Sequence, residues 1–430
     1  MKIKEQSGLR EVLDSVKLPR MYMVRQIFEK DGIKDPAGVL EQKLKESGLG
    51  SRIRPGMKVV LTGSSRQISN MPLVLRELAD FVRAHGASPY IVPAMGSHGG
   101  ATAQGQKEIL EGYGITEEYC RCPIWSSMET VCVGHMKCGD EVRIDRFAKE
   151  ADAVIVVGRI KAHTAFRGTY ESGLVKMIAI GLGKREGADS LHQAGFGVMG
   201  ERLIEYAGIS FSHCNIIFGV GVIENEFDET CRIEVIPSEE IFEKEPALLQ
   251  YAKSRLPRIL FPETDVLVVG EIGKNFSGSG MDPNVTGTFG TPYASGGIRK
   301  QRTVVLDISE ESHGNFVGLG KADISTLRAF EKLDTNATYF NMITSTVLEV
   351  GKIPMILEDD RLALKTAVKT LTQVDKNRVR MVYIKNTLSL QTLMISEELL
   401  VQAKEMERVE ILEGPRDFCF DKDGTLLDLR

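Results

Sequence analysis

Two histidines stand directly after apolar runs, in loops of small or polar residues. His98 lies in the segment MGSHGG and His163 ends the segment RIKAH, and the chain holds only seven histidines. An imidazole has an unperturbed pKa of about 6.5, which suits it to acid/base catalysis at neutral pH. A pair in neighbouring loops can address opposite faces of one ligand, so the two positions indicate proton transfer. The competing interpretation is that each histidine only caps its loop through a backbone hydrogen bond.

Lys176 stands in an apolar run, LVKMIAI. The lysine either extends its ammonium group to the surface or is buried with a lowered pKa, and a neutral amine can act as a nucleophile or carry a covalent attachment. Composition alone favours the first arrangement. His192 follows sixteen residues later, beyond a glycine-rich turn, and is a candidate metal ligand.

The elements that would position these residues are strands of a parallel sheet. Short β-branched runs alternate with amphipathic segments of about a dozen residues, which is typical of βαβ units. The predicted strands at residues 58–62, 90–93 and 153–157 end just before the segment Ser64-Ser65-Arg66, the His98 loop and the His163 loop. Ligands of open α/β sheets bind at the carboxyl ends of strands, so we expect these three loops to share one site.

A domain boundary is predicted where Pro257 and Pro262 break a helical segment. We expect an α/β fold of two α/β domains with largely parallel sheets and the active site in the cleft between them. The N-terminal domain would span residues 1–258, and a smaller domain at 259–396 would cover the substrate. Segment 397–430 would return to the first domain. Further strands are predicted at 215–222, 231–235, 265–269, 303–308, 354–357, 379–384 and 409–412, and helices at 73–85, 106–113, 201–207, 326–332, 361–370 and 397–406.

Length and composition limit the class of protein. At 430 residues the chain is long enough for two domains, and 42% apolar with 26% charged residues is typical of a soluble α/β protein. A net charge of −5 with both signs scattered argues against a nucleic-acid partner and favours a small-molecule ligand. No run of about 18 apolar residues and no signal-peptide core are present. We therefore expect a cytoplasmic protein with no membrane segment.

The seven cysteines argue against a disulfide framework, because their number is odd and no export signal precedes them. One residue separates Cys120 from Cys122, and five separate Cys132 from Cys138. Structural zinc sites usually show two intervening residues. We interpret these cysteines as ordinary buried or half-exposed thiols.

The run HTAFRGTYESGLVK, from His163 to Lys176, followed by His192, resembles the signature region of the nickel-pincer lactate racemases and their homologues. The His98 loop and the Ser64-Ser65-Arg66 loop come in the same order as in that family. The resemblance runs through most of the chain and is specific over residues 58–192.

This resemblance implies a cofactor on Lys176. The cofactor would be a nickel-pincer nucleotide, of the pyridinium-3-thioamide-5-thiocarboxylic acid mononucleotide type, joined to the lysine through a thioamide. Its two sulfurs and a ring carbon would bind nickel, with His192 as the fourth ligand. Ser64 and Arg66 would contact the cofactor. The implied partners are the proteins that synthesise and deliver it.

The implied activity is racemisation or epimerisation of a 2-hydroxy acid. Hydride would leave the carbon for the cofactor and return to the other face of a planar 2-keto acid, with His98 and His163 as the paired acid/base residues. Arg66 would hold the substrate carboxylate through a bidentate guanidinium contact.

The chain departs from the family pattern on the substrate side. Thirteen positions separate His163 from Lys176, and Arg167 and Glu171 lie between them. Serine replaces the acidic residue that precedes the arginine of the first loop. In the second domain, Lys274 is the candidate for the substrate-binding lysine. These changes leave the cofactor chemistry intact and favour a larger or more polar 2-hydroxy acid than lactate.

Two other functions remain open from the sequence. A zinc-dependent hydrolase could use His98, His163 and His192 with Glu171 as base, but no His-x-x-x-His pair exists and Lys176 would have no role. A non-catalytic protein could bind an organic acid, but binding alone needs no paired acid/base residues.

Overall fold

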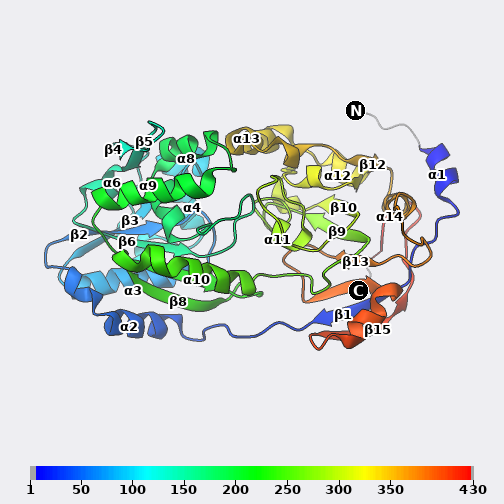
Figure 1. Cartoon of the computed structure of the whole chain (residues 1–430), viewed down its shortest axis with the longest axis horizontal. Helices are drawn as coiled ribbons and strands as arrows, with labels where there is room; N and C mark the ends of the chain where they lie inside the picture. The colour runs from blue at the N-terminus through cyan, green and yellow to red at the C-terminus, as the bar shows by residue number, and fades with distance from the viewer. Residues whose placement is uncertain (1–5, 428–430) are drawn as a thin grey trace. The chain divides into compact units, whose positions relative to one another are not determined.

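The computed structural model describes residues 6–427, which form two compact units (Figure 1). The central unit is Lys30–Leu256. The composite unit joins Met1–Glu29 to Pro257–Arg430. Both are α/β, so the expected class of two α/β domains with largely parallel sheets is confirmed. No helix within the described residues is both long and apolar enough to cross a membrane.

The central unit is built on a five-stranded sheet in the order β3-β2-β6-β7-β8. Its first four strands run parallel, and β8 is antiparallel at the edge. The parallel strands are near-continuous apolar runs because helices cover both faces of the sheet. Figure 1 shows α8 and α9 on one side and α2 and α3 on the other. The strands are β2 Lys58–Gly63, β3 Ser88–Pro93, β6 Ala153–Arg159, β7 Ile216–Glu224 and β8 Thr230–Pro237.

The remaining elements of the central unit are helices and one separate hairpin. Side chains cap four of the helix starts described here: Asp35 accepts from Gly38 N, Thr102 from Gly105 N, Thr116 from Tyr119 N and Asp145 from Ala148 N. The hairpin is β4 Thr130–His135 with β5 Glu141–Asp145. The helices are α2 Pro36–Ser47, α3 Met71–Ala84, α4 Ala103–Gly112, α5 Glu117–Cys120, α6 Arg146–Glu150, α7 Leu174–Lys176, the π-helical turn η3 Met177–Gly181, α8 Lys184–Gln193, α9 Met199–His213 and α10 Ile241–Ser254.

The composite unit is built on an eight-stranded mixed sheet in the order β12-β11-β10-β9-β13-β14-β1-β15. The strands from β12 to β13 run parallel, and β14, β1 and β15 are each antiparallel to the strand before them. The strands are β1 Met21–Gln26, β9 Val266–Ile272, β10 Arg302–Ile308, β11 Ile324–Thr326, β12 Met355–Leu357, β13 Met381–Ile384, β14 Thr392–Ser396 and β15 Val409–Arg416. The helices are α1 Ser7–Leu13, α11 Pro283–Thr286, α12 Leu327–Glu331, α13 Thr335–Ser345, α14 Asp360–Lys369 and α15 Leu400–Glu405.

The predicted assignment of the chain ends was wrong. Segment 397–430 does not return to the N-terminal domain, because β15 pairs with β1 and β1 pairs with β14 inside the composite sheet. The described residues before Lys30 also belong to the composite unit and not to a domain spanning 1–258. Met21 and Val24 of β1 are fully buried between these neighbours. β1 thus pairs with the edge of β14, and β15 pairs with the other edge of β1. Without these two pairings, backbone groups of β14 or β1 would form an open edge.

Candidate functional site

The three predicted loops leave the same edge of the central sheet. Gly63 at the end of β2 lies opposite Pro93 at the end of β3, and β6 runs parallel to β2 on its other side. Ala94 N donates to Gly63 O over 2.7 Å, which joins the first two loops where they begin. The segments carrying Arg66, His98 and His163 therefore start side by side at the carboxyl ends of parallel strands.

Arg66 has the properties of an anion-binding residue. The buried Ser64 fixes its loop, because Ser64 Oγ donates to the Arg66 carbonyl over 3.1 Å. Desolvation lowers the pKa of Arg66, and the nearby Arg159 lowers it further. Among the described residues no carboxylate pairs with Arg66, although the chain has many ion pairs elsewhere. A partly desolvated guanidinium without a protein partner favours an anionic ligand.

His163 is held by its backbone and by one ring nitrogen. Its N–H donates to the buried carboxylate of Glu171 over 2.7 Å, and its Nδ1 accepts from Ala165 N over 3.1 Å. The neutral ring therefore carries its proton on Nε2. Desolvation lowers the pKa of His163 well below 6.5, and the charge of Lys176 lowers it further. His163 is consequently neutral at physiological pH.

Glu171 is fully committed to protein contacts. Besides His163 N it pairs with Lys253 over 2.7 Å and with Arg167 over 3.4 Å. The contacts with His163 and Arg167 lie within the segment between His163 and Lys176, and the contact with Lys253 joins that segment to α10. Glu171 is thus a positioning residue and not a free base, a role that its position in the sequence did not reveal.

Lys176 ends the short helix α7, directly before the π-helical turn η3. Its side chain is half-buried, and desolvation lowers its pKa to about 8, with Arg66 lowering it further and Glu171 opposing the shift. The exposed arrangement that composition favoured is therefore not the one observed. An amine with a pKa near neutrality is the form that covalent chemistry requires.

Glu245 supports the helix that presents Lys176. Its buried carboxylate accepts from Val175 N over 2.9 Å, at the start of α7. A Cβ at Gly173 would lie 2.1 Å from Glu245 Oε1, so glycine is needed to admit the carboxylate. Desolvation raises the pKa of Glu245 to about 7. This residue lies about 70 positions from Lys176, and no local pattern in the sequence pointed to it.

His192 lies on α8 and is half-buried. Desolvation lowers its pKa to about 4, the charge of Lys176 lowers it further, and Asp189 opposes the shift. The ring of Phe196 contacts both histidines, with its centroid 5.9 Å from that of His192 and 6.1 Å from that of His163. A neutral imidazole is the form that binds metal.

Four of the predicted residues thus act on one another electrostatically and are called the Lys176 cluster: Arg66, His163, Lys176 and His192. The charge of Lys176 lowers the pKa values of both histidines, and that of Arg66 lowers those of His163 and Lys176. The cluster combines one anion-binding group, one reactive amine and two neutral imidazoles.

His98 is exposed and enters from the neighbouring loop after β3. Its Nδ1 donates to the Met95 carbonyl over 2.7 Å, so the proton of the neutral ring is on Nδ1 and Nε2 is the basic atom. Gln106 anchors the same loop by donating to Gly96 O over 2.8 Å and to His98 O over 3.3 Å. In their neutral forms the two histidines therefore hold opposite tautomers.

A buried lysine holds Gln106 in turn. Lys184 is fully buried, donates to Gln106 Oε1 over 3.1 Å and to the Pro93 carbonyl, and pairs with Asp145 over 3.2 Å. Burial lowers the pKa of Lys184, whereas the carboxylate of Asp145 raises it. This network ties the His98 loop to β3, α4 and β5.

Two other predictions concern residues outside the Lys176 cluster. Lys274 follows β9 in the composite unit, where Nζ donates to Gly278 O over 2.7 Å. The three histidines of the zinc alternative do not form a metal-ligating group within the described residues 6–427. The hydrolase hypothesis therefore has no support from the geometry.

Comparisons with known proteins bear on these residues. The model of the lactate racemase N-terminal domain matches residues 22–202, which include the Lys176 cluster and His98. The lactate racemase apoprotein from Thermoanaerobacterium thermosaccharolyticum is 12% identical with a TM-score of 0.49, over 85% of this chain and 93% of that one. A crystal structure of a Thermotoga maritima protein is 17% identical with a TM-score of 0.47, over 65% of this chain and 71% of that one. A search of curated proteins finds no match.

Proposed function

We propose, from the match of residues 22–202 to the lactate racemase N-terminal domain, that this chain racemises or epimerises a 2-hydroxy acid with a nickel-pincer nucleotide attached to Lys176. The observation that carries the proposal is the Lys176 cluster, in which an amine of lowered pKa lies with an unpaired guanidinium and two neutral imidazoles. Neither a hydrolase nor a simple acid-binding site needs all three kinds of group.

The residues present fit this cofactor. Lys176 offers an amine with a pKa of about 8 for the covalent bond, and His192 offers a neutral nitrogen donor beside it. The buried Ser64 and the more exposed Arg66 follow β2 at the same edge of the sheet. When bound, the nickel-pincer group supplies the hydride acceptor and donor for the substrate carbon. The protein must then bind the acid, exclude water and move one proton.

Arg66 is the group that would bind the substrate carboxylate. It has no competing carboxylate among the described residues, and partial desolvation strengthens a charge-assisted hydrogen bond. Holding the carboxylate fixes the carbon and the hydroxyl next to it, which converts proton transfer into a reaction between positioned groups.

His98 and His163 would divide the proton transfer according to their tautomers. Nε2 of His98 is basic and can accept the proton of the 2-hydroxyl group. Nε2 of His163 carries a hydrogen and can donate a hydrogen bond to the oxygen as it becomes a carbonyl. Reversal on the other face of the planar keto acid requires the two histidines to exchange these roles.

The substrate class follows from the contacts that replace the family pattern. The segment from His163 to Lys176 is longer and carries Arg167 and Glu171, and Lys253 of α10 pairs with Glu171. We propose a larger or more polar 2-hydroxy acid than lactate. The partners are this substrate and the proteins that make and deliver the cofactor.

The test is production of the chain together with a pincer-synthesis pathway, followed by intact mass, metal analysis and a chiral assay on a panel of 2-hydroxy acids. We expect added mass on the peptide with Lys176, one nickel per chain and conversion of one stereoisomer into the other. Lys176→Arg keeps the positive charge but cannot form the thioamide, and is the matched control. Turnover by Lys176→Arg would refute the covalent cofactor. A loaded chain without any turnover would favour the acid-binding role.

A further inference from the structure

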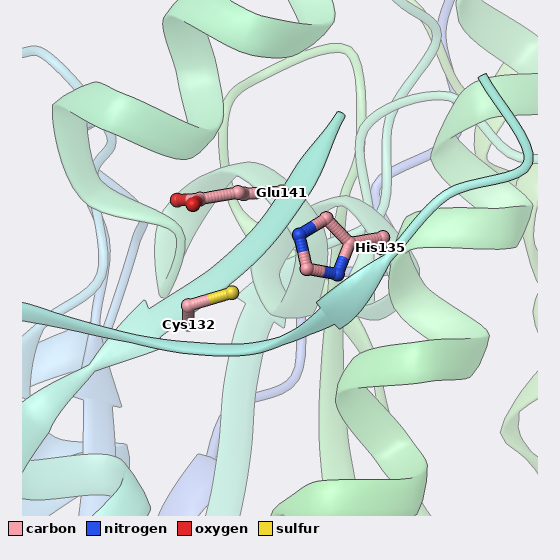
Figure 2. Close-up of side chains that lie close together, drawn as sticks. All are labelled: Cys132, His135 and Glu141. Atoms are coloured by element: carbon pink, nitrogen blue, oxygen red, sulfur yellow. The ribbon is translucent and has the colours of Figure 1, made fainter. Parts of the chain in front are cut away.

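The β4–β5 hairpin carries a second group of metal-ligating side chains: Cys132, His135 and Glu141. One ligand atom from each lies within 4.8 Å of the other two, and all three side chains are exposed. Figure 2 shows the sulfur of Cys132 turned towards the His135 ring, with the Glu141 carboxylate coming from the neighbouring strand. Over residues 6–427, no other group of His, Cys, Asp or Glu meets this spacing.

A bulge in the hairpin places these side chains on one face. Cys132 and His135 are three residues apart, so a regular strand would point them to opposite faces. The register instead shifts just after Cys132, which lies opposite Arg143. His135 lies opposite Glu141. The intervening Val133 is buried, and both candidate ligands reach the exposed face. β-bulges commonly redirect a side chain in this way.

The donor set is one that zinc prefers. A thiolate, an imidazole and a carboxylate are the three protein ligand types of tetrahedral zinc sites. Zinc bonds of about 2.1 to 2.3 Å require ligand atoms roughly 3.5 Å apart, so small side-chain rotations from the observed spacing would suffice. The exposed position leaves a fourth place for water.

Glu141 can leave its present partner at little cost. It now pairs with Arg143, whose Nε also lies 2.7 Å from Glu186 and 2.8 Å from Thr130 Oγ1. Arg143 therefore keeps its contacts with the Glu186 carboxylate and the Thr130 hydroxyl if Glu141 rotates to bind a metal ion. Exposed ion pairs contribute little to stability, so replacing the Glu141–Arg143 ion pair by a bond between Glu141 and a metal ion is favourable.

We propose that Cys132, His135 and Glu141 bind one divalent transition-metal ion of the zinc type, separate from the metal expected at His192. The Cys132 thiol gives its proton to solvent as the metal–sulfur bond forms, so binding weakens at low pH. The ion joins β4 to β5 across the bulge, where the ladder of backbone hydrogen bonds is irregular.

The test is a titration of the reduced, metal-free full chain with Co²⁺, using protein made without a pincer-synthesis pathway. We expect one ion per chain and a sulfur-to-cobalt charge-transfer band, with Zn²⁺ displacing the cobalt. Cys132→Ser should abolish the band. His135→Ala and Glu141→Gln should each weaken binding by roughly tenfold or more.

Two control variants separate this site from others. Cys138→Ser removes an exposed thiol in the turn of the same hairpin, and His192→Ala removes the ligand expected at Lys176. Both should keep the band and the affinity of the unmodified chain. The proposal is wrong if no band forms, if Cys132→Ser still shows it, or if either control variant loses it.

Discussion

Lys176 shows how burial in the folded chain changes the chemistry of one residue. Desolvation lowers its pKa to about 8. The neutral amine therefore appears as pH rises through about 8, well below the pH of about 10.4 at which an ordinary lysine loses its proton. In the chain without cofactor, we predict that acylation of Lys176 rises with a midpoint near pH 8. Peptide mass spectrometry over a pH series measures this, with the peptide containing the exposed Lys137 as reference. Parallel profiles for the two peptides would contradict the prediction.

The raised pKa of Glu245 leads to a second prediction, which concerns the pH dependence of the free energy of unfolding. Its pKa of about 7 in the folded chain lies above the ordinary value of 4.5. The contribution of the Glu245 carboxyl to the stability of the folded chain is therefore fully present below about pH 4.5, and it is lost as the pH rises through about 7. Glu245→Gln cannot ionise, so its unfolding free energy should vary less over this range, by up to roughly 3 kcal/mol.

Denaturant unfolding at pH 5 and pH 8 measures the difference. The single tryptophan, Trp125, belongs to the central unit, as Glu245 does, so its fluorescence reports the unfolding of that unit. Glu243→Gln, on the exposed side of the same helix, should keep the pH dependence of the unmodified chain. Equal pH dependence in Glu245→Gln would show that Glu245 does not titrate in this range.

At the scale of elements, the network from Lys184 through Gln106 positions the His98 loop. Gln106→Glu keeps an acceptor for Lys184 but loses the donor to the carbonyls of Gly96 and His98. We expect the loaded enzyme to lose about tenfold to a hundredfold in kcat with little change in KM, because the substrate still meets Arg66 while the base is displaced.

A readout independent of turnover checks the same network. Amide hydrogen exchange in residues 95–101 should become faster in Gln106→Glu, while exchange in β2 stays unchanged. Gln104→Glu, an exposed change on the same helix, is the control. Unchanged exchange in the loop would mean that Gln106 does not position it.

The elements themselves were mostly predictable. The strands predicted at 58–62, 90–93 and 153–157 correspond to β2, β3 and β6. They could be recognised because parallel strands that are buried on both faces consist of nearly unbroken apolar runs. The β4–β5 hairpin was not predicted. Its bulge interrupts the alternation of exposed and buried side chains by which a half-exposed strand is recognised.

At the scale of the whole molecule, the pairing of β15 with β1 gives the C-terminal segment a structural role. Removing residues 409–430 would leave β1 with an open edge beside the fully buried Met21 and Val24. We predict a less stable composite unit and self-association through the exposed strand. Size-exclusion chromatography and a denaturant series measure both effects. The Trp125 transition of the central unit should stay the same, and a monomeric truncated chain of unchanged stability would contradict the prediction.

We could predict the fold class, the order of the loops and the residue types of the candidate site from the sequence alone. Strand-forming runs and the loops that follow them are local features, and local physics fixes them. Only the tertiary structure shows what depends on distant neighbours: the lowered pKa of Lys176 and the support from Glu245 about 70 residues away. Burial and backbone partners set each of these, and neither is encoded in adjacent residues. The same reason applies to the chain ends, which pair in one sheet although nearly 400 residues separate them.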